Sequence, residues 1–450
     1  MSAATSGSGA LAFTVDEVAD GLCAYVDASP SPFHAVETTA AMLQEAGFVR
    51  LDEAEPWPQE KGRFFTVRGG SLVAWSTEHA AGPDSPMRVV GAHTDSPNLR
   101  IKPRPDLARA GWQLLGVEVY GGALVNSWLD RDLGLSGRVT VRSGDVLEPR
   151  LLRVDDPVLR VSQLAIHLDR GINDEGLRLN KQQHLAPHWG LGDAPGDFQT
   201  YVAEQLDVSR EDVLGWDLMT HDLTPARRIG RERELVAAAR LDNLATSHAG
   251  TRALVAAVEQ APVEPTTQVL VLFDHEEVGS MSERGAFSQL FPTVVERIVG
   301  QLGGGRDELH RALAATVIAS GDMAHATHPN YAERHEPQHT IAMNGGPVLK
   351  INTNLRYATD SLGAAAFRAA GDQAGVPVQE FVTRSDLPCG STVGPMTAAS
   401  TGATTVDFGA PTLSMHSTRE LAGAPDQAMY AACLAAFLSP AVPLRKVPRG

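Results

Sequence analysis

The segment Gln268-Val-Leu-Val-Leu-Phe-Asp-His-Glu-Glu277 joins an uninterrupted apolar run to four consecutive polar residues. A short continuous run of this kind, rich in Val and Leu, is typical of a β-strand that is buried on both faces. In open α/β sheets, ligands bind beyond the carboxyl ends of the strands, which is where these polar residues fall. The segment therefore predicts a parallel sheet that carries reactive side chains along one edge.

Three other apolar runs end in the same way. They are residues 88–92 before His93, 316–319 before Asp322, and 404–408 ahead of His416. Helical patterns lie ahead of and between the runs, at residues 16–26, 33–45, 241–260, 291–302, 362–374 and 426–438. Strands that alternate with helices predict an α/β fold with a mainly parallel sheet and helices on both faces.

Residues 101–232 break this alternation. They hold short strand-like pieces at 112–120, 137–142 and 158–165, together with turn signals such as Arg142-Ser-Gly-Asp145. We therefore predict that 101–232 form an inserted β-rich domain. Residues 1–100 and 233–450 would then form the domain that carries the polar strand ends.

Composition limits the classes of function. The chain has 450 residues, of which 43% are hydrophobic and 20% charged, as in globular proteins. Its net charge of −16 repels nucleic acid and anionic membrane surfaces, which argues against both as partners. No apolar run approaches the roughly 18 residues that cross a bilayer, and the first basic residue is Arg50, so a secretory signal is not expected. We predict a cytoplasmic protein.

The three cysteines form no C-x-x-C motif, so the ligands of any metal are expected to be His and carboxylates. His93, at a strand end, suits a metal ligand, and Asp95 two residues later suits a supporting group. Glu276 and Glu277 are adjacent carboxylates whose mutual repulsion a nearby cation relieves. One of them can then bind metal while the other stays free as a base.

Three further residues complete the pattern: Asp242 at a helix start, Asp322 after a strand, and His416 in a loop. Each motif also has a simpler interpretation, such as a helix-capping charge for Asp242 or a solvated acidic turn for the Glu pair. Taken together, two imidazoles and three carboxylates have the composition of a two-metal hydrolytic site in which one carboxylate is shared.

These motifs, in this order and with a β-rich insertion after the first ligand, resemble the aspartyl aminopeptidase family of co-catalytic zinc exopeptidases. The similarity also includes Ser31-Pro-Phe-His34-Ala, Gln163-Leu-Ala-Ile-His167-Leu, His328-Pro-Asn-Tyr331 and Leu349-Lys-Ile-Asn-Thr-Asn-Leu-Arg-Tyr357, and so covers nearly the whole chain. The resemblance implies two zinc ions, which manganese or cobalt can replace, bound by His93, Asp242, Glu277, Asp322 and His416. It also implies that Asp242 bridges the ions, that Glu276 is the general base and that Asp95 supports the first ligand.

The resemblance further implies a homododecamer built from dimers, with the insertion as the assembly domain. In it, His167 reaches the active site of a neighbouring subunit and contacts the developing oxyanion. The expected reaction removes single amino-terminal residues from peptides, Asp and Glu above all. An acidic side chain entering a protein of charge −16 needs a local cation. Lys350 is the first candidate and Arg356 the second, and we expect Tyr357 and Met323 in the same pocket.

Three alternatives stand beside this interpretation. The same chemistry can prefer apolar amino-terminal residues. A non-catalytic protein can use metals only to hold its fold, although an intact Glu276 argues against that. The roles of Glu276 and Glu277 can also be exchanged, since the two residues are adjacent.

Other catalytic motifs are excluded. His335-Glu-Pro-Gln-His339 formally fits H-E-x-x-H, which needs a continuous helix. Pro337 in its centre opposes a helix by about 3 kcal/mol. The sequence also contains neither the G-x-S-x-G of serine hydrolases nor a P-loop.

Overall fold

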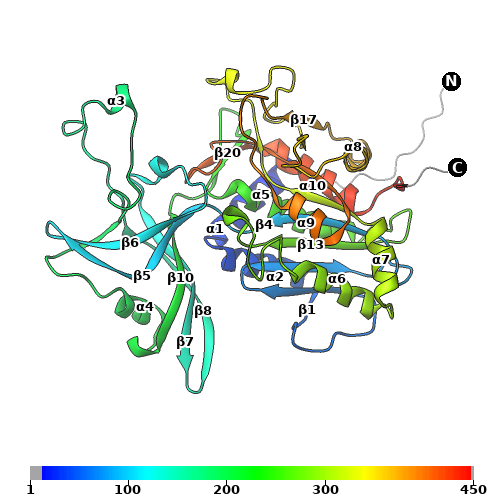
Figure 1. Cartoon of the computed structure of the whole chain (residues 1–450), viewed down its shortest axis with the longest axis horizontal. Helices are drawn as coiled ribbons and strands as arrows, with labels where there is room; N and C mark the ends of the chain where they lie inside the picture. Colours follow the sequence, from blue (N-terminus) through cyan, green and yellow to red (C-terminus); the bar gives the residue numbers. More distant parts are fainter. Residues whose placement is uncertain (1–12, 447–450) are drawn as a thin grey trace.

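A nine-stranded sheet forms the centre of the larger part of the molecule (Figure 1). The computed structural model describes residues 13–446. Four central neighbours, β13, β4, β14 and β18, pair in parallel, which confirms the predicted mainly parallel sheet. In spatial order the strands are β1 (Val49–Arg50), β2 (Arg63–Arg68), β3 (Ser71–Ser76), β13 (Thr267–Phe273), β4 (Met87–His93), β14 (Val317–Gly321), β18 (Thr404–Gly409), β16 (Val348–Ile351) and β17 (Gln379–Val382).

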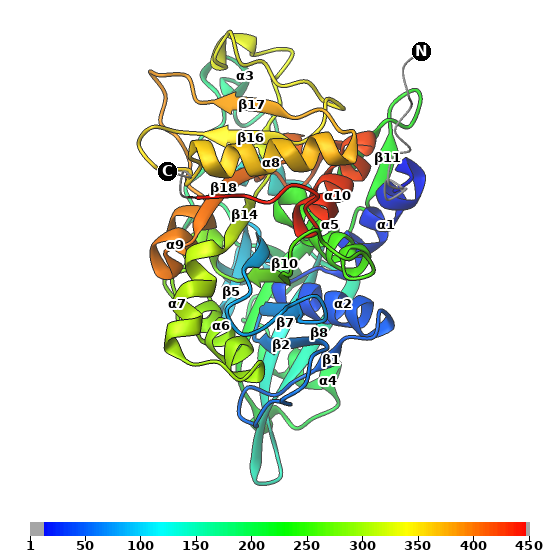
Figure 2. The same ribbon diagram turned by 90° about the vertical axis from the view of Figure 1, so that its right-hand side faces the viewer.

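Helices cover both faces of this sheet (Figure 2). One face packs against α1 (Val15–Ala28), α2 (Pro32–Glu45), α5 (Leu241–Ala257), α8 (Ser361–Ala374) and α10 (Ala424–Leu438), and the other against α6 (Leu290–Gln301), α7 (Arg306–Ala315) and α9 (Val393–Thr401). Alternate residues of β13 enter the two cores, Leu270 on one face and Val271 on the other. The sheet is therefore buried on both sides, as its apolar runs predicted. The sequence analysis did not predict α7 or α9.

A separate six-stranded antiparallel sheet forms most of the inserted region, at the left of Figure 1. Its order is β8 (Val146–Leu159), β7 (Leu133–Ser143), β10 (Val213–Asp222), β5 (Asn98–Arg109), β6 (Trp112–Tyr120) and β9 (His188–Leu191). The helix α4 (Phe198–Leu206) packs on it and contributes to a separate hydrophobic core. The strand predicted at 112–120 coincides with β6, and that at 137–142 lies within β7.

The strand predicted at 158–165 is wrong. Only its first two residues belong to a strand, the end of β8. Within the predicted strand, Val161 is buried but forms only an isolated bridge with Leu129, and Leu164 is exposed. The chain leaves the sheet there and forms a protruding segment, residues 162–187, which contains the short helix α3 (Ile172–Glu175) (Figure 1).

A third, five-stranded sheet lies beside the polar strand ends. It consists of β11 (Arg227–Ile229), β12 (Leu235–Ala238), β20 (Glu420–Gly423), β19 (Pro411–Leu413) and β15 (Ala324–His325). The loop between β19 and β20 carries His416. None of the helices within residues 13–446 combines the length and the apolar character that crossing a bilayer requires.

Candidate metal centre

The structure brings all five predicted ligands together at the carboxyl edge of the main sheet. His93 ends β4, Asp322 follows β14, and Glu277 lies in η3 (Glu276–Val278), a short 3₁₀ helix just after β13. Asp242 is the second residue of α5, and His416 comes from the loop before β20. Because β13, β4 and β14 are neighbours in the sheet, their ends deliver these side chains to one place.

Two groups of potential ligands share Asp242, and a third group joins His93, Glu276 and Glu277. In the inner triad, His93 Nε2 lies 3.3 Å from Asp242 Oδ1 and 3.7 Å from Asp322 Oδ1. In the outer triad, His416 Nε2 lies 3.3 Å from both Asp242 Oδ2 and Glu277 Oε1. Each imidazole therefore faces a different oxygen of the shared carboxylate.

These residues fit bound metal ions. Asp242 Oδ1 and Glu277 Oε1 are buried without a hydrogen-bond partner in the described chain, and an unpaired buried carboxylate is costly. Burial, together with the charges of Asp322 and Asp95, raises the pKa of Glu276 to about 8. A cation offsets both penalties, and imidazole and carboxylate are donors that zinc accepts.

The two adjacent glutamates occupy different positions. Glu277 belongs to the outer triad, and its side chain is 4% exposed. Glu276 Oε2 lies 4.0 Å from His93 Nε2, and its side chain is 16% exposed. Glu276 therefore lies at the margin of the ligands and nearer to solvent.

Asp95 supports the site in an unexpected way. Its carboxylate accepts the backbone N–H groups of Glu276 at 3.0 Å and Glu277 at 3.1 Å, and the hydroxyl of Tyr120 at 2.7 Å. The His93 ring is held instead by the Asp95 backbone, because Nδ1 lies 2.9 Å from that carbonyl oxygen and 3.5 Å from the carboxylate. The Asp95 side chain thus chiefly orients the turn that carries the two glutamates.

Glu420 is a buried residue of the site that the sequence analysis did not select. Its two carboxylate oxygens accept the backbone N–H groups of Asp242 at 2.8 Å and His416 at 2.7 Å. Burial and the charge of Asp242 raise the pKa of Glu420 to about 8. Its place four residues after His416 was the only sequence signal. Glu420 therefore fixes the backbone of two members of the outer triad, Asp242 and His416.

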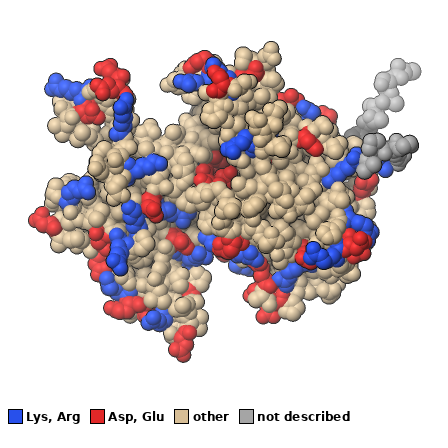
Figure 3. Space-filling model, in the orientation of Figure 1, with Lys and Arg blue, Asp and Glu red and all other residues tan. Residues whose placement is uncertain are grey.

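A cavity of about 460 Å³ opens onto the ligands. Figure 3 shows acidic side chains gathered in a hollow between the two parts of the molecule. Lys350, Tyr357 and Met323, which we expect in the substrate pocket, line the cavity together with Phe381, Met396 and Met415. Lys350 is buried, and its Nζ donates to the Met323 carbonyl oxygen at 3.0 Å and lies 3.4 Å from Asp322 Oδ2.

Two other predicted residues lie elsewhere. Arg356 is exposed, donates to the backbone oxygen of Cys389 at 3.2 Å and does not line this cavity. His167 lies exposed in the protruding segment and does not line it either. The excluded motif around Pro337 is not helical: η4 (Ala332–Arg334) ends before it, as its sequence predicted.

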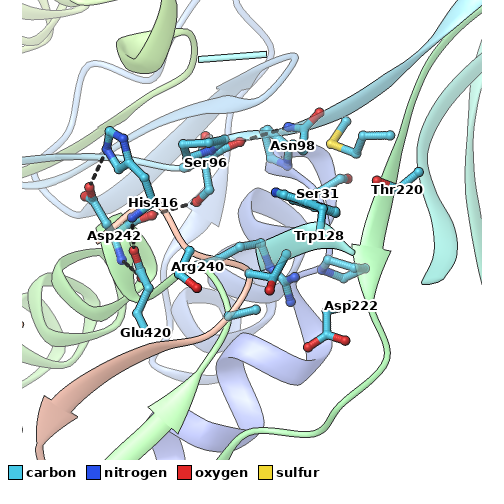
Figure 4. Close-up of a pocket in the computed structure, with 18 residues that line it drawn as sticks. Ser31, Ser96, Asn98, Trp128, Thr220, Asp222, Arg240, Asp242, His416 and Glu420 are labelled. Carbon is cyan, nitrogen blue, oxygen red and sulfur yellow. Dashed lines mark hydrogen bonds and ion pairs between the residues drawn. The ribbon is translucent and has the colours of Figure 1, made fainter. Parts of the chain in front are cut away.

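A second, small cavity of about 20 Å³ lies behind the outer triad, against the inserted sheet. Figure 4 shows Asp242, His416 and Glu420 at one side of it and Trp128 and Thr220 at the other. Ser96 lines this cavity, and its Oγ donates a hydrogen bond of 2.7 Å to the Asp242 carbonyl oxygen. The space suits about one water molecule and is too small for a peptide.

Comparison with known proteins gives one consistent result. The family described as aminopeptidase I zinc metalloprotease (M18) matches residues 25–438. Probable M18 family aminopeptidase 2 of Mycobacterium leprae is 55% identical over 421 residues, which are 93% of this chain and 97% of that protein. A chain in the cryo-EM structure of the Ape4 and Nbr1 complex has a TM-score of 0.90 at 35% identity, covering 94% of this chain and 86% of that one. A chain of the S. cerevisiae mApe1 dodecamer has a TM-score of 0.81 at 27% identity, covering 94% and 96%.

Proposed function

Since this chain belongs to the M18 family of zinc metallo-aminopeptidases, we propose that it removes single residues, Asp and Glu above all, from the amino terminus of peptides at a two-zinc centre. The observation that carries the proposal is the pair of triads that share Asp242. His93 and Asp322 would hold one ion and Glu277 and His416 the other, with Asp242 serving both. Bound zinc supplies Lewis acidity and lowers the pKa of a bound water.

Glu276 is the general base in this proposal. It belongs to neither triad that contains Asp242, although it also groups with His93 and Glu277, and it is more exposed than Glu277. Its carboxylate takes the proton of the attacking water and returns it to the leaving nitrogen. Asp95 fixes the backbone of Glu276, so the carboxylate needs little reorientation to do so.

Lys350 is the proposed specificity residue. It is the only Lys or Arg among the described residues that line the cavity. A carboxylate on the terminal residue accepts a charge-assisted hydrogen bond from Nζ, the stronger class of hydrogen bond. The methionine and aromatic side chains beside it favour the alternative, an apolar terminal residue.

We propose the same homododecamer built from dimers that the resemblance implied, with His167 acting in the site of a neighbour. The S. cerevisiae mApe1 structure is a dodecamer, and His167 stands exposed in the protruding segment, away from the metal centre of its own chain. Peptides are the expected partners, and a cytoplasmic location stays a prediction.

The test is a panel of peptides that differ only in the terminal residue: Asp, Glu, Leu and acetylated Asp. We expect the purified protein to cleave Asp and Glu fastest and the acetylated peptide not at all. Chelation should abolish turnover, and zinc, manganese or cobalt should restore it. Full activity after verified removal of metal would refute the two-zinc centre, and faster cleavage of Leu would refute the acidic preference.

A further inference from the structure

We propose that Tyr120-Gly121-Gly122, at the end of β6, positions the outer triad and Glu276, so that the inserted sheet controls one of the two metal positions. We call these three residues the β6 strap. The inference rests on the proposed metal ligands. It adds a positioning role within the same chain, separate from that of His167 in a neighbouring subunit.

The first contact runs through Tyr120. Its hydroxyl donates to Asp95 Oδ2 at 2.7 Å, and the same carboxylate receives the N–H groups of Glu276 and Glu277. The Asp95 carboxylate accepts hydrogen bonds from three donors at once, which is possible in only one orientation of the side chain. The Tyr120 hydroxyl fixes that orientation, and with it the turn that carries both glutamates.

The second contact runs through the backbone of Gly122. Its carbonyl oxygen accepts from His416 Nδ1 at 3.1 Å. A carbonyl only accepts, so Nδ1 carries a proton, and in the neutral ring this leaves the lone pair of Nε2 facing Asp242 and Glu277. This is the ring orientation and tautomer that a metal ligand needs.

The small size of the two glycines is part of the arrangement. Gly121 has φ +68°, and a Cβ there would lie 3.1 Å from the Cβ of Glu277. A Cβ on Gly122 would lie 3.0 Å from His416 Nδ1. Any side chain at either position therefore pushes against a residue of the outer triad.

The strap is itself held firmly by the insertion. Tyr120 pairs with Asn98 of β5, and the Arg100 guanidinium lies 4.1 Å above its ring. Just beyond the strap, Leu124 N donates to the His416 carbonyl oxygen at 3.0 Å. Within residues 13–446, the strap reaches the centre through two hydrogen bonds, from the Tyr120 hydroxyl to Asp95 and from His416 to the Gly122 carbonyl, and neither involves the inner ligands His93 or Asp322. Its effect should therefore be selective for the outer position.

The decisive variant is Tyr120→Phe in the full-length, assembled protein, with Tyr25→Phe as the matched control. Tyr25 is also buried, and its hydroxyl lies 2.7 Å from Thr39 Oγ1. Zinc affinity would be measured by competition with a chelator. The affinity that is lost in His416→Ala is the one that belongs to the outer triad. We expect Tyr120→Phe to weaken the outer zinc by about 10- to 100-fold and leave the inner zinc unchanged. The kcat should fall more than KM changes, and Tyr25→Phe should match the wild type.

A second pair of variants tests the strap without changing the Tyr120 hydroxyl. Gly122→Ala places its Cβ against His416, whereas Gly215→Ala, in β10 of the same sheet, meets nothing within 4 Å. We expect only Gly122→Ala to weaken the outer zinc. Equal weakening of both zinc ions, or wild-type affinities in an assembled Tyr120→Phe protein, would overturn the strap alone. A wild-type protein that binds no zinc would overturn the proposed function as well.

Discussion

The inner and outer triads share Asp242 but are built in different ways. The inner ligands His93 and Asp322 stand at or just beyond the ends of strands in the main sheet, and the His93 side chain is 1% exposed. In the outer triad, His416 lies in a loop, has φ +67° and is 29% exposed. The core packing of the sheet places the inner ligands. The positions of the outer ligands depend on hydrogen bonds that Asp95, Glu420 and the Gly122 carbonyl of the β6 strap accept.

This difference indicates how the centre can be altered selectively. A ligand at a buried strand end cannot move without disturbing close-packed neighbours. A ligand on a loop turns when one supporting hydrogen bond is lost. We therefore expect changes around the outer triad to affect metal binding without unfolding, and changes at the inner triad to affect both.

The largest effect should come from Asp242→Asn, because this residue belongs to both triads. The amide keeps the shape but removes the charge that both positions share. We expect both metal positions to weaken and turnover to fall by more than about 10⁴-fold, beyond what the base alone contributes. Metal content and activity would be measured on the same sample. A protein that retains both ions would show that the triads are independent.

The next effect separates the triads directly. His416→Ala should lose the outer metal and keep the inner one, with a fall in turnover greater than the about 100-fold typical of a supporting residue. His93→Ala should lose the inner metal and also lower the free energy of unfolding of the metal-free protein by about 0.5–3 kcal/mol, because it removes a side chain that is 1% exposed, whereas that of His416 is 29% exposed. Equal stability of the two metal-free variants, measured by denaturant unfolding, would contradict this comparison.

A smaller effect is expected from Glu420→Gln. The amide presents an N–H group where the carboxylate accepts an N–H from Asp242 or His416, so one of the two bonds is lost. We expect metal affinity to fall by about 10- to 100-fold. Asp426→Asn is the matched control, because Asp426 accepts two backbone N–H groups, from Asn344 and Gly346, in the same way elsewhere. An equal loss of metal affinity in the control would assign the effect to general destabilisation.

The smallest effect concerns substrate choice and replaces no residue of either triad. Lys350→Met should reduce turnover of a terminal Asp relative to Leu by about 10- to 100-fold, the usual worth of a hydrogen bond to a charged group. Arg356→Met should leave that ratio within about twofold, since Arg356 does not line the cavity. An equal ratio of Asp to Leu turnover in Lys350→Met and Arg356→Met would show that Lys350 is not the specificity residue.

The sequence predicted the inner ligands better than it predicted the residues that support the outer triad. Apolar runs before His93 and Asp322 indicate buried strands, and buried strands fix where the next side chain lies. The supports of the outer triad act through backbone groups, such as the Gly122 carbonyl and the N–H groups that Glu420 accepts. Backbone partners leave no pattern in side-chain identity, so neither the strap nor Glu420 was predicted.

The insertion was predicted as a β-rich region but not in detail. Its strand at 112–120 was correct, whereas the strand expected at 158–165 ends at Leu159, and Leu164 within it is exposed. Period-two alternation reports only that one side is apolar, and it does not tell whether this chain or a partner covers that side. The role of Asp95 was uncertain for a similar reason, because its backbone and its carboxylate serve different neighbours.

The most direct test of the account is to measure metal content and turnover of Glu276→Gln and Glu277→Gln side by side. Glu277 belongs to the outer triad, and Glu276 stands at its margin. We predict that Glu276→Gln keeps both metal ions and loses about 10²- to 10⁴-fold in turnover, the range that general acid–base assistance contributes. Glu277→Gln should lose the outer ion. A Glu276→Gln protein that loses metal, beside a metal-replete and inactive Glu277→Gln protein, would contradict the assignment and exchange the two roles.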